Sequence, residues 1–293
     1  MSEPLVSVLI TAYNREKYIA EAINSVLDST YKNFEIIIVD DGSSDMTVSI
    51  AEEYVHKDER VKLFVNPQNL GQFANRNKAA SYANGEYLKY LDSDDKISKD
   101  GLEKIMNVML QYPEAAFGSQ STNDVIGLTF PRESYINYYF KGNKLLYAGP
   151  SGVIFKTSVF KEVGGFSEIG GILSDTLLML TIAAIYPLAS LPANFLYWRV
   201  HDERVTILQE DEYSMVIERN SINNIILHSP ECPLTRRECN VIKQNQKSIF
   251  IRKSFLILIK IKSLRKYLHL LGIQNIASQD FLIALTPNKT LEA

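Results

Sequence analysis

Short apolar segments alternate with amphipathic ones through the first hundred residues, and this alternation constrains the fold more than any other feature. Residues 5–10, 34–39, 61–65 and 87–91 are short and largely apolar, as buried strands are. The segments between them are long enough for a helix to return the chain to the same edge of a sheet. The pattern predicts an α/β fold with a mostly parallel central sheet and helices on both faces.

Farther along the chain the periodicity is less regular. Asp100 and Glu103 have the spacing of a capping box and predict the start of a helix. Residues 135–147, rich in tyrosine and lysine, predict a loop or a short helix, and residues 175–185 predict a helix. Residues 195–200 read as a late strand.

Two acidic clusters follow predicted strands. Asp40-Asp41-Gly42-Ser43 comes after the second strand and Asp92-Ser93-Asp94-Asp95 after the fourth. In a parallel sheet the carboxyl ends of the strands share one rim, so we expect both clusters there, although about fifty residues separate them. Carboxylates such as these suit Mg²⁺ or Mn²⁺ bound together with diphosphate oxygens. Each cluster alone is explained as well by ordinary turn and helix-cap chemistry.

Five motifs read together are more specific than either cluster alone. In chain order they are Ser7–Asn14, Phe34–Ser44, Asn69-Leu70-Gly71 with Arg76-Asn77, Ala83–Asp95 and Gly164–Glu168. In this order and spacing the chain resembles the inverting family 2 glycosyltransferases with the GT-A fold, over much of its first two hundred residues. The resemblance implies metal-dependent transfer of a sugar, with inversion, from a nucleotide-sugar donor to an acceptor hydroxyl. A UDP-sugar is the favoured donor. By analogy it also implies synthesis of a bacterial surface polysaccharide or other glycan, with a glycan or lipid-linked glycan as acceptor.

The resemblance also implies roles for individual residues. Those expected to bind the donor are Thr11, Tyr13, Asp40, Arg76, Asp92 and Ser93. Asp94 is expected to bind Mn²⁺ or Mg²⁺ directly, so that the cation offsets charge on the departing diphosphate. Tyr13 offers a stacking surface for the nucleobase, although ordinary packing would also explain a single tyrosine.

The family carries its general base in a Glu-Asp pair soon after the Gly-Gly-Phe loop. This chain has Ser174-Asp175 at that place, so the Asp is present and the Glu is replaced. We expect Asp175 to take the proton from the acceptor hydroxyl. The alternative is a structural role for Asp175 as a helix N-cap, and Ser174 could be that cap instead.

Residues 197–201, Tyr-Trp-Arg-Val-His, resemble a late Tyr-Arg-x-His segment of many family members. His201 is a candidate third metal ligand or diphosphate contact, and a plain surface histidine is the alternative. Trp198, the only tryptophan, could stack on a sugar ring or pack in the core.

Charge divides the chain unevenly. Residues 241–273 hold eight Lys or Arg and no Asp or Glu, whereas the rest holds 23 basic and 34 acidic residues. We therefore expect a catalytic domain over residues 1–212 and a helical, basic region over 213–293. This basic region could contact an anionic membrane. Its alternative is a helical bundle packed on the catalytic domain. We expect a cytoplasmic protein, reaching the inner face of the cell membrane if the tail binds there, and no nucleic-acid partner.

Two other functions stay open. A sugar nucleotidyltransferase shares metal carboxylates on a similar sheet, but it would carry a glycine-rich basic loop where this chain has Thr11-Ala12-Tyr13-Asn14. A non-catalytic nucleotide- or sugar-binding protein is compatible with the lost glutamate before Asp175. The sugar, the nucleobase and the acceptor are not encoded in these motifs.

Overall fold

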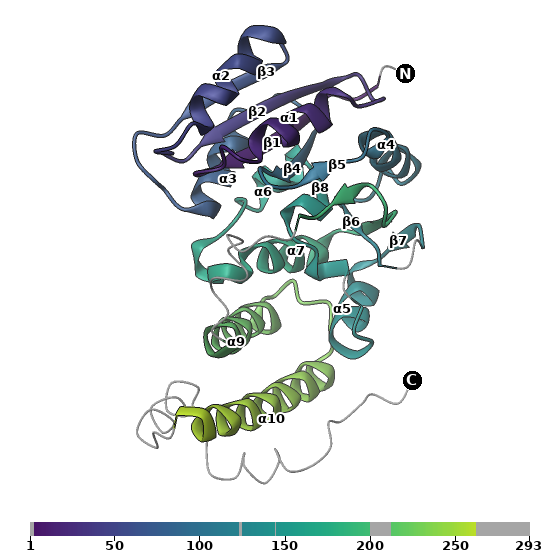
Figure 1. Ribbon diagram of the computed structural model, residues 1–293. Coiled ribbons are helices and arrows are strands. Elements are labelled where there is room, and N and C mark those ends of the chain that lie inside the picture. The colour runs from purple at the N-terminus through teal and green to yellow at the C-terminus, as the bar shows by residue number, and fades with distance from the viewer. Residues whose placement is uncertain (1–2, 123–124, 144, 200–211, 262–293) are drawn as a thin grey trace.

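The computed structural model describes residues 3–122, 125–143, 145–199 and 212–261 (Figure 1). Its main sheet has eight strands in the order β3-β2-β1-β4-β8-β6-β9-β7. These strands are β1 Val6–Ala12, β2 Phe34–Asp40, β3 Val61–Val65, β4 Tyr87–Asp92, β6 Phe117–Gln120, β7 Gly127–Thr129, β8 Val153–Lys156 and β9 Leu188–Leu191. A two-stranded sheet pairs β5 Lys96–Ile97 with β10 Leu196–Tyr197. The predicted α/β fold is confirmed.

Helices connect these strands. The α-helices are α1 Ile19–Leu27, α2 Thr47–Lys57, α3 Gln72–Ser81, α4 Gly101–Gln111, α5 Pro131–Phe140, α6 Thr157–Glu162, α7 Ser174–Ile185, α9 Glu212–His228 and α10 Arg236–Ile261. Three 3₁₀ segments are η1 Leu145–Tyr147, η2 Pro150–Gly152 and η3 Glu168–Leu173. Two of these segments, η2 and η3, lie beside the candidate site described below.

The four N-terminal strands are parallel, and the chain reverses its direction of travel across the sheet at β1. It runs from β1 outward through β2 to β3 and then returns to the other side of β1 as β4. The register places Ala12 opposite Asp40 and Thr11 opposite Asp92. Both acidic clusters therefore lie on one rim, at the topological switch point where such sheets bind ligands.

Beyond β4 the sheet becomes mixed. Strand β8 runs antiparallel to both β4 and β6, and β9 returns parallel to β6. Because β8 is reversed, it is the beginning of this strand, not its end, that lies beside the carboxyl end of β4. The turn that precedes β8, which is η2, is brought to the same rim.

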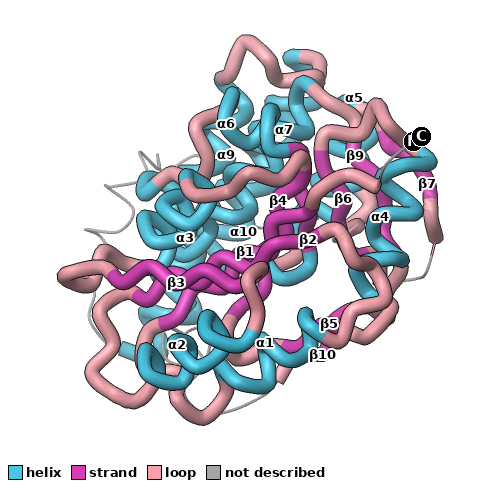
Figure 2. Tube along the Cα trace, turned by 90° about the horizontal axis from the view of Figure 1, so that it is seen from above, coloured by secondary structure: helices cyan, strands magenta, loops and turns pink. Residues whose placement is uncertain are grey.

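The sheet buries both of its faces. Alternate residues of β1 and β2 enter two hydrophobic clusters: Leu9 and Ile37 pack with α3, α6 and α7, whereas Val8 and Ile36 pack with α1 and α4. Figure 2 shows these helices on the two sides of the strands. Strands buried on both faces need continuous apolar sequence, which is why β1 and β2 were recognisable from the sequence.

The helix expected after Asp100 is present, but the capping box expected at its start was wrong. Asp100 is the residue before α4, but its side chain makes no cap hydrogen bond; it accepts from Ser98 and pairs with Lys104. Glu103 accepts a hydrogen bond from the Thr30 hydroxyl instead of closing a capping box. Residues 135–147 contain the end of α5 and η1, and the late strand is only Leu196–Tyr197.

The described C-terminal residues form two helices that pack on the rest of the protein (Figure 1). Ile222 and Ile226 of α9 and Ile242 of α10 are buried in the cluster that also contains α7. Arg132 of α5 donates two hydrogen bonds to Glu238 of α10, at 2.8 and 2.7 Å. Whether residues 213–293 are a separate domain stays a prediction.

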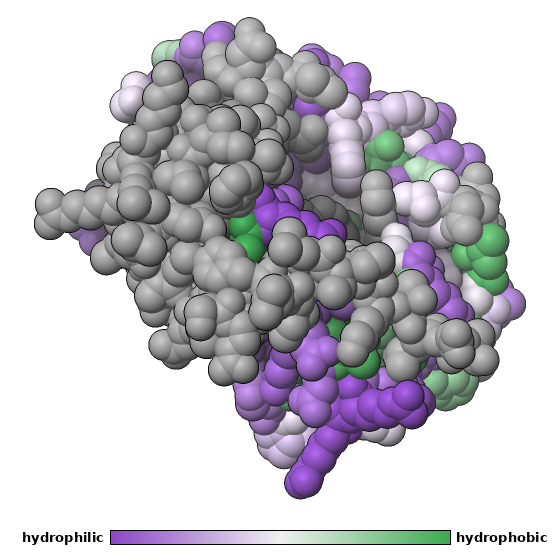
Figure 3. Space-filling model, turned by 90° about the horizontal axis from the view of Figure 1, so that it is seen from below, coloured by the Kyte–Doolittle hydropathy of each residue, from purple (hydrophilic) through white to green (hydrophobic). Residues whose placement is uncertain are grey.

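The described residues at the α10 end can be compared by their hydropathy. Figure 3 views that end, and its coloured residues are largely hydrophilic, with small separate hydrophobic groups. By length and composition one helical stretch of the described chain, Glu168–Ile185, could cross a membrane, but 61% of it is buried inside the protein. This stretch is therefore explained as a core helix.

Candidate active site

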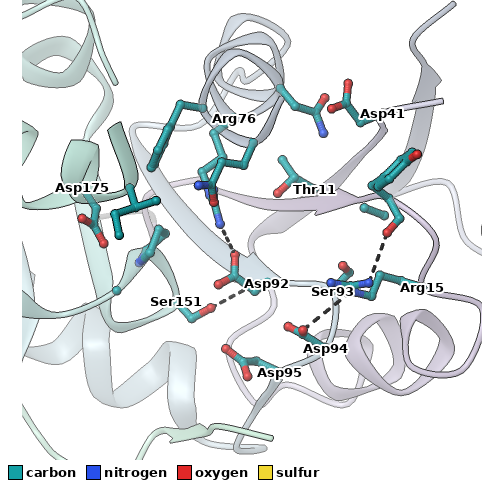
Figure 4. A pocket seen from close by; sticks show the side chains of 18 of the residues that line it. Thr11, Arg15, Asp41, Arg76, Asp92, Ser93, Asp94, Asp95, Ser151 and Asp175 are labelled. Atoms are coloured by element: carbon teal, nitrogen blue, oxygen red, sulfur yellow. Dashed lines mark hydrogen bonds and ion pairs between the residues drawn. The ribbon is translucent and has the colours of Figure 1, made fainter. Parts of the chain in front are cut away.

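One cavity of about 710 Å³ opens at the carboxyl-end rim of the sheet. The ends of β1 and β4 and the start of α3 line one side, and η3 with the first turn of α7 lines the other. In Figure 4, Asp41 and Arg15 lie on one side of the cavity, Asp175 lies on the opposite side, and Asp92 lies between them. Residues from four of the five sequence motifs, together with Asp175, thus share a single space.

The loop after β1 forms the first part of this wall. Thr11, Tyr13 and Arg15 line the cavity, and the Tyr13 side chain is 47% exposed, so its ring is available for stacking. The loop is bound to the turn after β2: the Asn14 amide donates to the Ser43 hydroxyl at 2.8 Å and the Arg15 amide to the Thr47 hydroxyl at 2.7 Å. Two motifs that are about thirty residues apart therefore hold each other in place.

The two aspartates at the end of β2, Asp40 and Asp41, lie in different surroundings. Asp40 is fully buried, accepts hydrogen bonds from the amide and hydroxyl of Ser43, and is not among the residues lining the cavity. Its neighbour Asp41 lines the cavity and accepts from the amides of Leu70 and Gly71 at 2.9 and 3.0 Å. Asp41, and not Asp40, therefore faces the cavity, and which of the two contacts a donor stays a prediction. The physical reason is that Asp40 is the last residue of β2, and its carboxylate braces the turn that follows.

Arg76 and Asp92 form the centre of the site. Both line the cavity, and the Arg76 guanidinium donates to Asp92 Oδ1 at 2.7 Å. Arg76 is buried, and its Nε has no hydrogen-bond partner among the described residues. A buried donor without a partner is costly, so this nitrogen is a candidate contact for a bound ligand.

The remaining residues of the second acidic cluster also face the cavity. Ser93, Asp94 and Asp95 all line it, and Asp94 Oδ2 lies 3.6 Å from Arg15 Nε. Burial, together with the charges of Asp92 and Asp94, raises the pKa of Asp95 to about 6.

The carboxylates of this cluster could supply some of the ligands of a divalent cation, but not a complete set. Among the residues that the structure describes, no three acidic, histidine or cysteine side chains group as a ready metal site. Mg²⁺ and Mn²⁺ need fewer, because one or two carboxylates suffice when diphosphate oxygens and water complete the shell. Asp94 lies on the cavity wall, and its carboxylate oxygens are ligands of the kind that such a cation prefers. His201 lies outside the described residues.

A buried lysine behind the cluster escaped the sequence analysis. Lys89 is fully buried in β4, and its ammonium donates to the backbone oxygens of Tyr90, at 2.7 Å, and Ser151. Burial lowers the pKa of Lys89 to about 7, opposed by the charges of Asp92 and Asp95. The lysine joins η2 to β4, and the Ser151 hydroxyl then accepts from the Asp92 amide at 2.9 Å. A charged residue in the middle of an otherwise apolar strand was the signal that could have found it.

Asp175 lies in the first turn of α7 on the far side of the cavity. The residue before the helix is Leu173, which makes no side-chain cap, so neither Asp175 nor Ser174 is the N-cap. Burial raises the pKa of Asp175 to about 6, against the lowering effect of the Thr176 amide and Arg76. A carboxylate with this pKa is suited to accept a proton near neutral pH.

Two contacts join the strand-end side of the cavity to segments farther along the chain. Asn77, next to Arg76, donates from Nδ2 to the Phe166 carbonyl and accepts from the Phe166 amide, at 2.8 and 2.9 Å. Gly165 must be glycine there, because a Cβ would lie 2.5 Å from Asn77 Oδ1. Arg199 donates from Nε to the Asp94 carbonyl, which keeps the half-exposed Trp198 at the cavity wall.

Of the residues expected in the site, most line this one cavity: Thr11, Tyr13, Arg76, Asp92, Ser93, Asp94 and Asp175. The residues missed by sequence reasoning are Arg15, Asp41, Lys89 and Ser151. Their roles in binding or catalysis stay predictions.

Comparison with known proteins connects this cavity to a family. The profile described as Glycosyl transferase family 2 matches residues 7–163, more than half of the 293 residues. The chain belongs to glycosyl transferase family 2. The match contains every cavity residue of the β1, β2, α3 and β4 motifs and ends before η3 and α7.

Two relatives named as glycosyltransferases are similar in sequence to part of this chain. An uncharacterised glycosyltransferase of Haemophilus influenzae is 46% identical over 111 residues, which are 38% of this chain and 44% of that protein. TuaG of Bacillus subtilis, provisionally named a teichuronic acid biosynthesis glycosyltransferase, is 44% identical over 37% of this chain and 43% of its own length. The chain spans less than half the length of these relatives.

Solved structures agree over nearly the whole chain. S. aureus TarS 1-349 in complex with UDP-GlcNAc has a TM-score of 0.72 and 22% identity, over 95% of this chain and 83% of that one. The mannosyltransferase PcManGT of Pyrobaculum calidifontis, in complex with GDP-Man and Mn²⁺, has a TM-score of 0.59 and 16% identity, over 97% of this chain and 86% of that one. At these identities the likeness establishes the GT-A fold of this family 2 member.

Proposed function

We propose that this protein transfers a sugar from a nucleoside diphosphate donor to an acceptor hydroxyl, with inversion at the anomeric carbon. The observation that carries the proposal is the placement of Asp175 across one cavity from the strand-end residues Thr11, Asp41 and Asp92. A donor held at the strand ends would present its sugar toward Asp175. A UDP-sugar is favoured, in keeping with the UDP-GlcNAc bound to TarS.

The chemistry assigned to this chain is one in-line displacement. Asp175 would take the proton from the acceptor oxygen as that oxygen bonds to the anomeric carbon, while the bond from that carbon to the diphosphate oxygen breaks. Arg76 and the strand-end residues would hold the donor, which supplies much of the rate by fixing the attack geometry. When bound at Asp94, Mn²⁺ or Mg²⁺ would offset the charge of the departing nucleoside diphosphate.

The biological setting proposed is bacterial surface polysaccharide or other glycan synthesis. The name of TuaG supports it. The acceptor proposed is a glycan or a lipid-linked glycan, used in the cytoplasm or at the inner face of the membrane. The basic residues of α10 and beyond are compatible with contact with an anionic membrane surface.

The test is a panel of nucleotide sugars with Mn²⁺, Mg²⁺ or EDTA. Binding is followed by thermal shift, products are identified by their leaving group, and the anomeric configuration of the product is read by NMR. Release of a nucleoside diphosphate and an inverted product are expected. Pyrophosphate would identify a nucleotidyltransferase instead, and donor binding without any turnover would identify a non-catalytic relative.

A further inference from the structure

The wall of the cavity nearest Asp175 is made by a short irregular loop. Segment η3, Glu168–Leu173, joins the Gly-Gly-Phe turn to α7, and its last two residues, Ile172 and Leu173, line the cavity. The loop is not a regular helix, because Gly171 interrupts it at φ 53° and ψ −135°. From within, the Ser174 hydroxyl closes it by donating to the Ser167 carbonyl at 2.6 Å. Further support comes from elsewhere in the chain.

That support includes a carboxylate from the C-terminal region. Glu218 of α9 accepts a hydrogen bond from the Ile172 amide, between N and Oε2, at 3.1 Å. Gly171 makes room for it: a Cβ at this position would lie 2.6 Å from the Glu218 carboxyl carbon. The left-handed φ of Gly171 favours glycine independently. Burial raises the pKa of Glu218, and the hydrogen bond from the Ile172 amide opposes this shift.

The helix that carries Glu218 is itself fixed. Ile222 and Ile226, one and two turns farther along α9, are buried at 2% and 3% exposure in the same hydrophobic cluster as Leu177 of α7. Asn223 accepts a hydrogen bond from the Tyr139 hydroxyl of α5 at 2.9 Å. Glu218 therefore projects from a packed helix, which makes it a rigid support for the loop.

We propose that Glu218 is a positioning residue for the acceptor side of the site. By holding the Ile172 amide it places Ile172 and Leu173 in the cavity wall and sets the start of α7, and so the direction of Asp175. The C-terminal helix α9 thereby forms part of the active-site architecture. The inference rests on the proposed function for its catalytic consequence, but the contact itself is independent of that function.

The experiment uses the full chain with Glu218→Ala and Glu218→Gln. Alanine removes the acceptor of the Ile172 amide, whereas glutamine keeps an oxygen in the same place. Hydrogen exchange of the peptide containing Ile172 is expected to be about tenfold faster in the alanine variant and close to wild type in the glutamine variant. In parallel, UDP release from UDP-GlcNAc with Mn²⁺ should slow by about tenfold in Glu218→Ala, with UDP affinity unchanged within about twofold and rescue by Glu218→Gln.

Arg132→Met is the matched control. It breaks the α5–α10 ion pair with Glu238 but leaves α9 and η3 in contact, so exchange at Ile172 should be unchanged. Unaltered Ile172 exchange in Glu218→Ala would overturn the proposal, and so would altered exchange with normal UDP release. A wild-type chain that binds donors but never releases a nucleoside diphosphate would count against the proposed function, and the exchange data alone would then decide whether Glu218 holds the loop.

Discussion

The two sides of the cavity are built in different ways. On the donor side the residues stand at the ends of parallel strands and are bonded to one another across short loops, as Asn14 is to Ser43 and Arg76 to Asp92. On the proposed acceptor side Asp175 lies in the first turn of a helix that follows a 3₁₀ loop. Asn77 of α3 holds the turn before that loop at Phe166, and Glu218 of α9 holds the loop itself at Ile172. The family profile contains the donor side and ends at residue 163, before the acceptor side begins. We infer that the strand ends supply the donor chemistry common to the family. The proposed acceptor side is built instead from segments that lie far apart in the sequence.

The two sides are functionally distinct only if the loss of Asp175 lowers the transfer rate and leaves donor affinity unchanged. Asp175→Asn should lower the transfer rate by about 10²–10⁴-fold, because an amide cannot take a proton from the acceptor. Donor affinity, measured by calorimetry, should be unchanged. Glu168→Gln, an exposed substitution in the adjoining η3, is the control and should retain activity. Normal turnover in Asp175→Asn would remove this residue from the mechanism.

A comparison of Asp41→Asn with Asp40→Asn tests which aspartate supports donor binding. Asp41→Asn leaves one of the amides of Leu70 and Gly71 without its acceptor oxygen at the cavity wall, at a cost of about 1–3 kcal/mol. Its donor affinity should fall about tenfold. Asp40→Asn should lower the free energy of unfolding but change donor affinity by less than about twofold, because this side chain braces only the turn at Ser43. The reverse order of donor affinities would return the nucleotide contact to Asp40.

The pH dependence of the transfer rate tests the role of Asp175 separately from donor binding. With a pKa of about 6, Asp175 loses its basic form as pH falls, so the rate at saturating donor should be about tenfold lower at pH 5 than at pH 8. Asp95 also has a pKa raised to about 6, so UDP affinity must be measured over the same range. A rate that stays flat down to pH 5, at constant donor saturation, would show that Asp175 is not the base.

The smallest expected effect is on stability. The folded-state pKa of Asp175 is raised from 3.8 to about 6, so its ionised form opposes folding as pH rises through this window, and the full cost is present above pH 6. Asp175→Asn should therefore raise the free energy of unfolding by about 1–2 kcal/mol at pH 8, a value reduced to allow for partial exposure to the cavity. Below about pH 4 the gain should vanish. Urea unfolding at both pH values measures it, and equal stability at pH 8 would argue against a costly buried charge.

Much of the donor side was predictable because its signals are local. Strands buried on both faces have continuous apolar sequences, and an acidic cluster directly after each one locates the rim. The choice between Asp40 and Asp41 was not local, because it depends on how the turn at Ser43 folds back on the last residue of β2. The capping box at Asp100 failed for a similar reason, since Thr30 and Lys104 take the side chains that would have formed it.

The acceptor side was less predictable because its contacts join distant segments. Asp175 was found through the resemblance, but nothing in the sequence near residue 172 indicates a partner 46 positions away at Glu218. The same difficulty occurs on the strand-end side, where Lys89 was visible as a charge within an apolar strand but its partner Ser151 follows after 62 residues. Such pairs need the fold before they can be recognised.

The reversed direction of β8 has a consequence for reading related chains. In a sheet whose strands all point one way, ligand-facing residues are sought just after each strand. Here an antiparallel neighbour brings the turn Pro150–Gly152, which precedes its strand, to the rim of the cavity. Searches for specificity determinants in homologous sequences should therefore scan upstream of this strand, where substitutions would reshape the pocket without disturbing the acidic motifs.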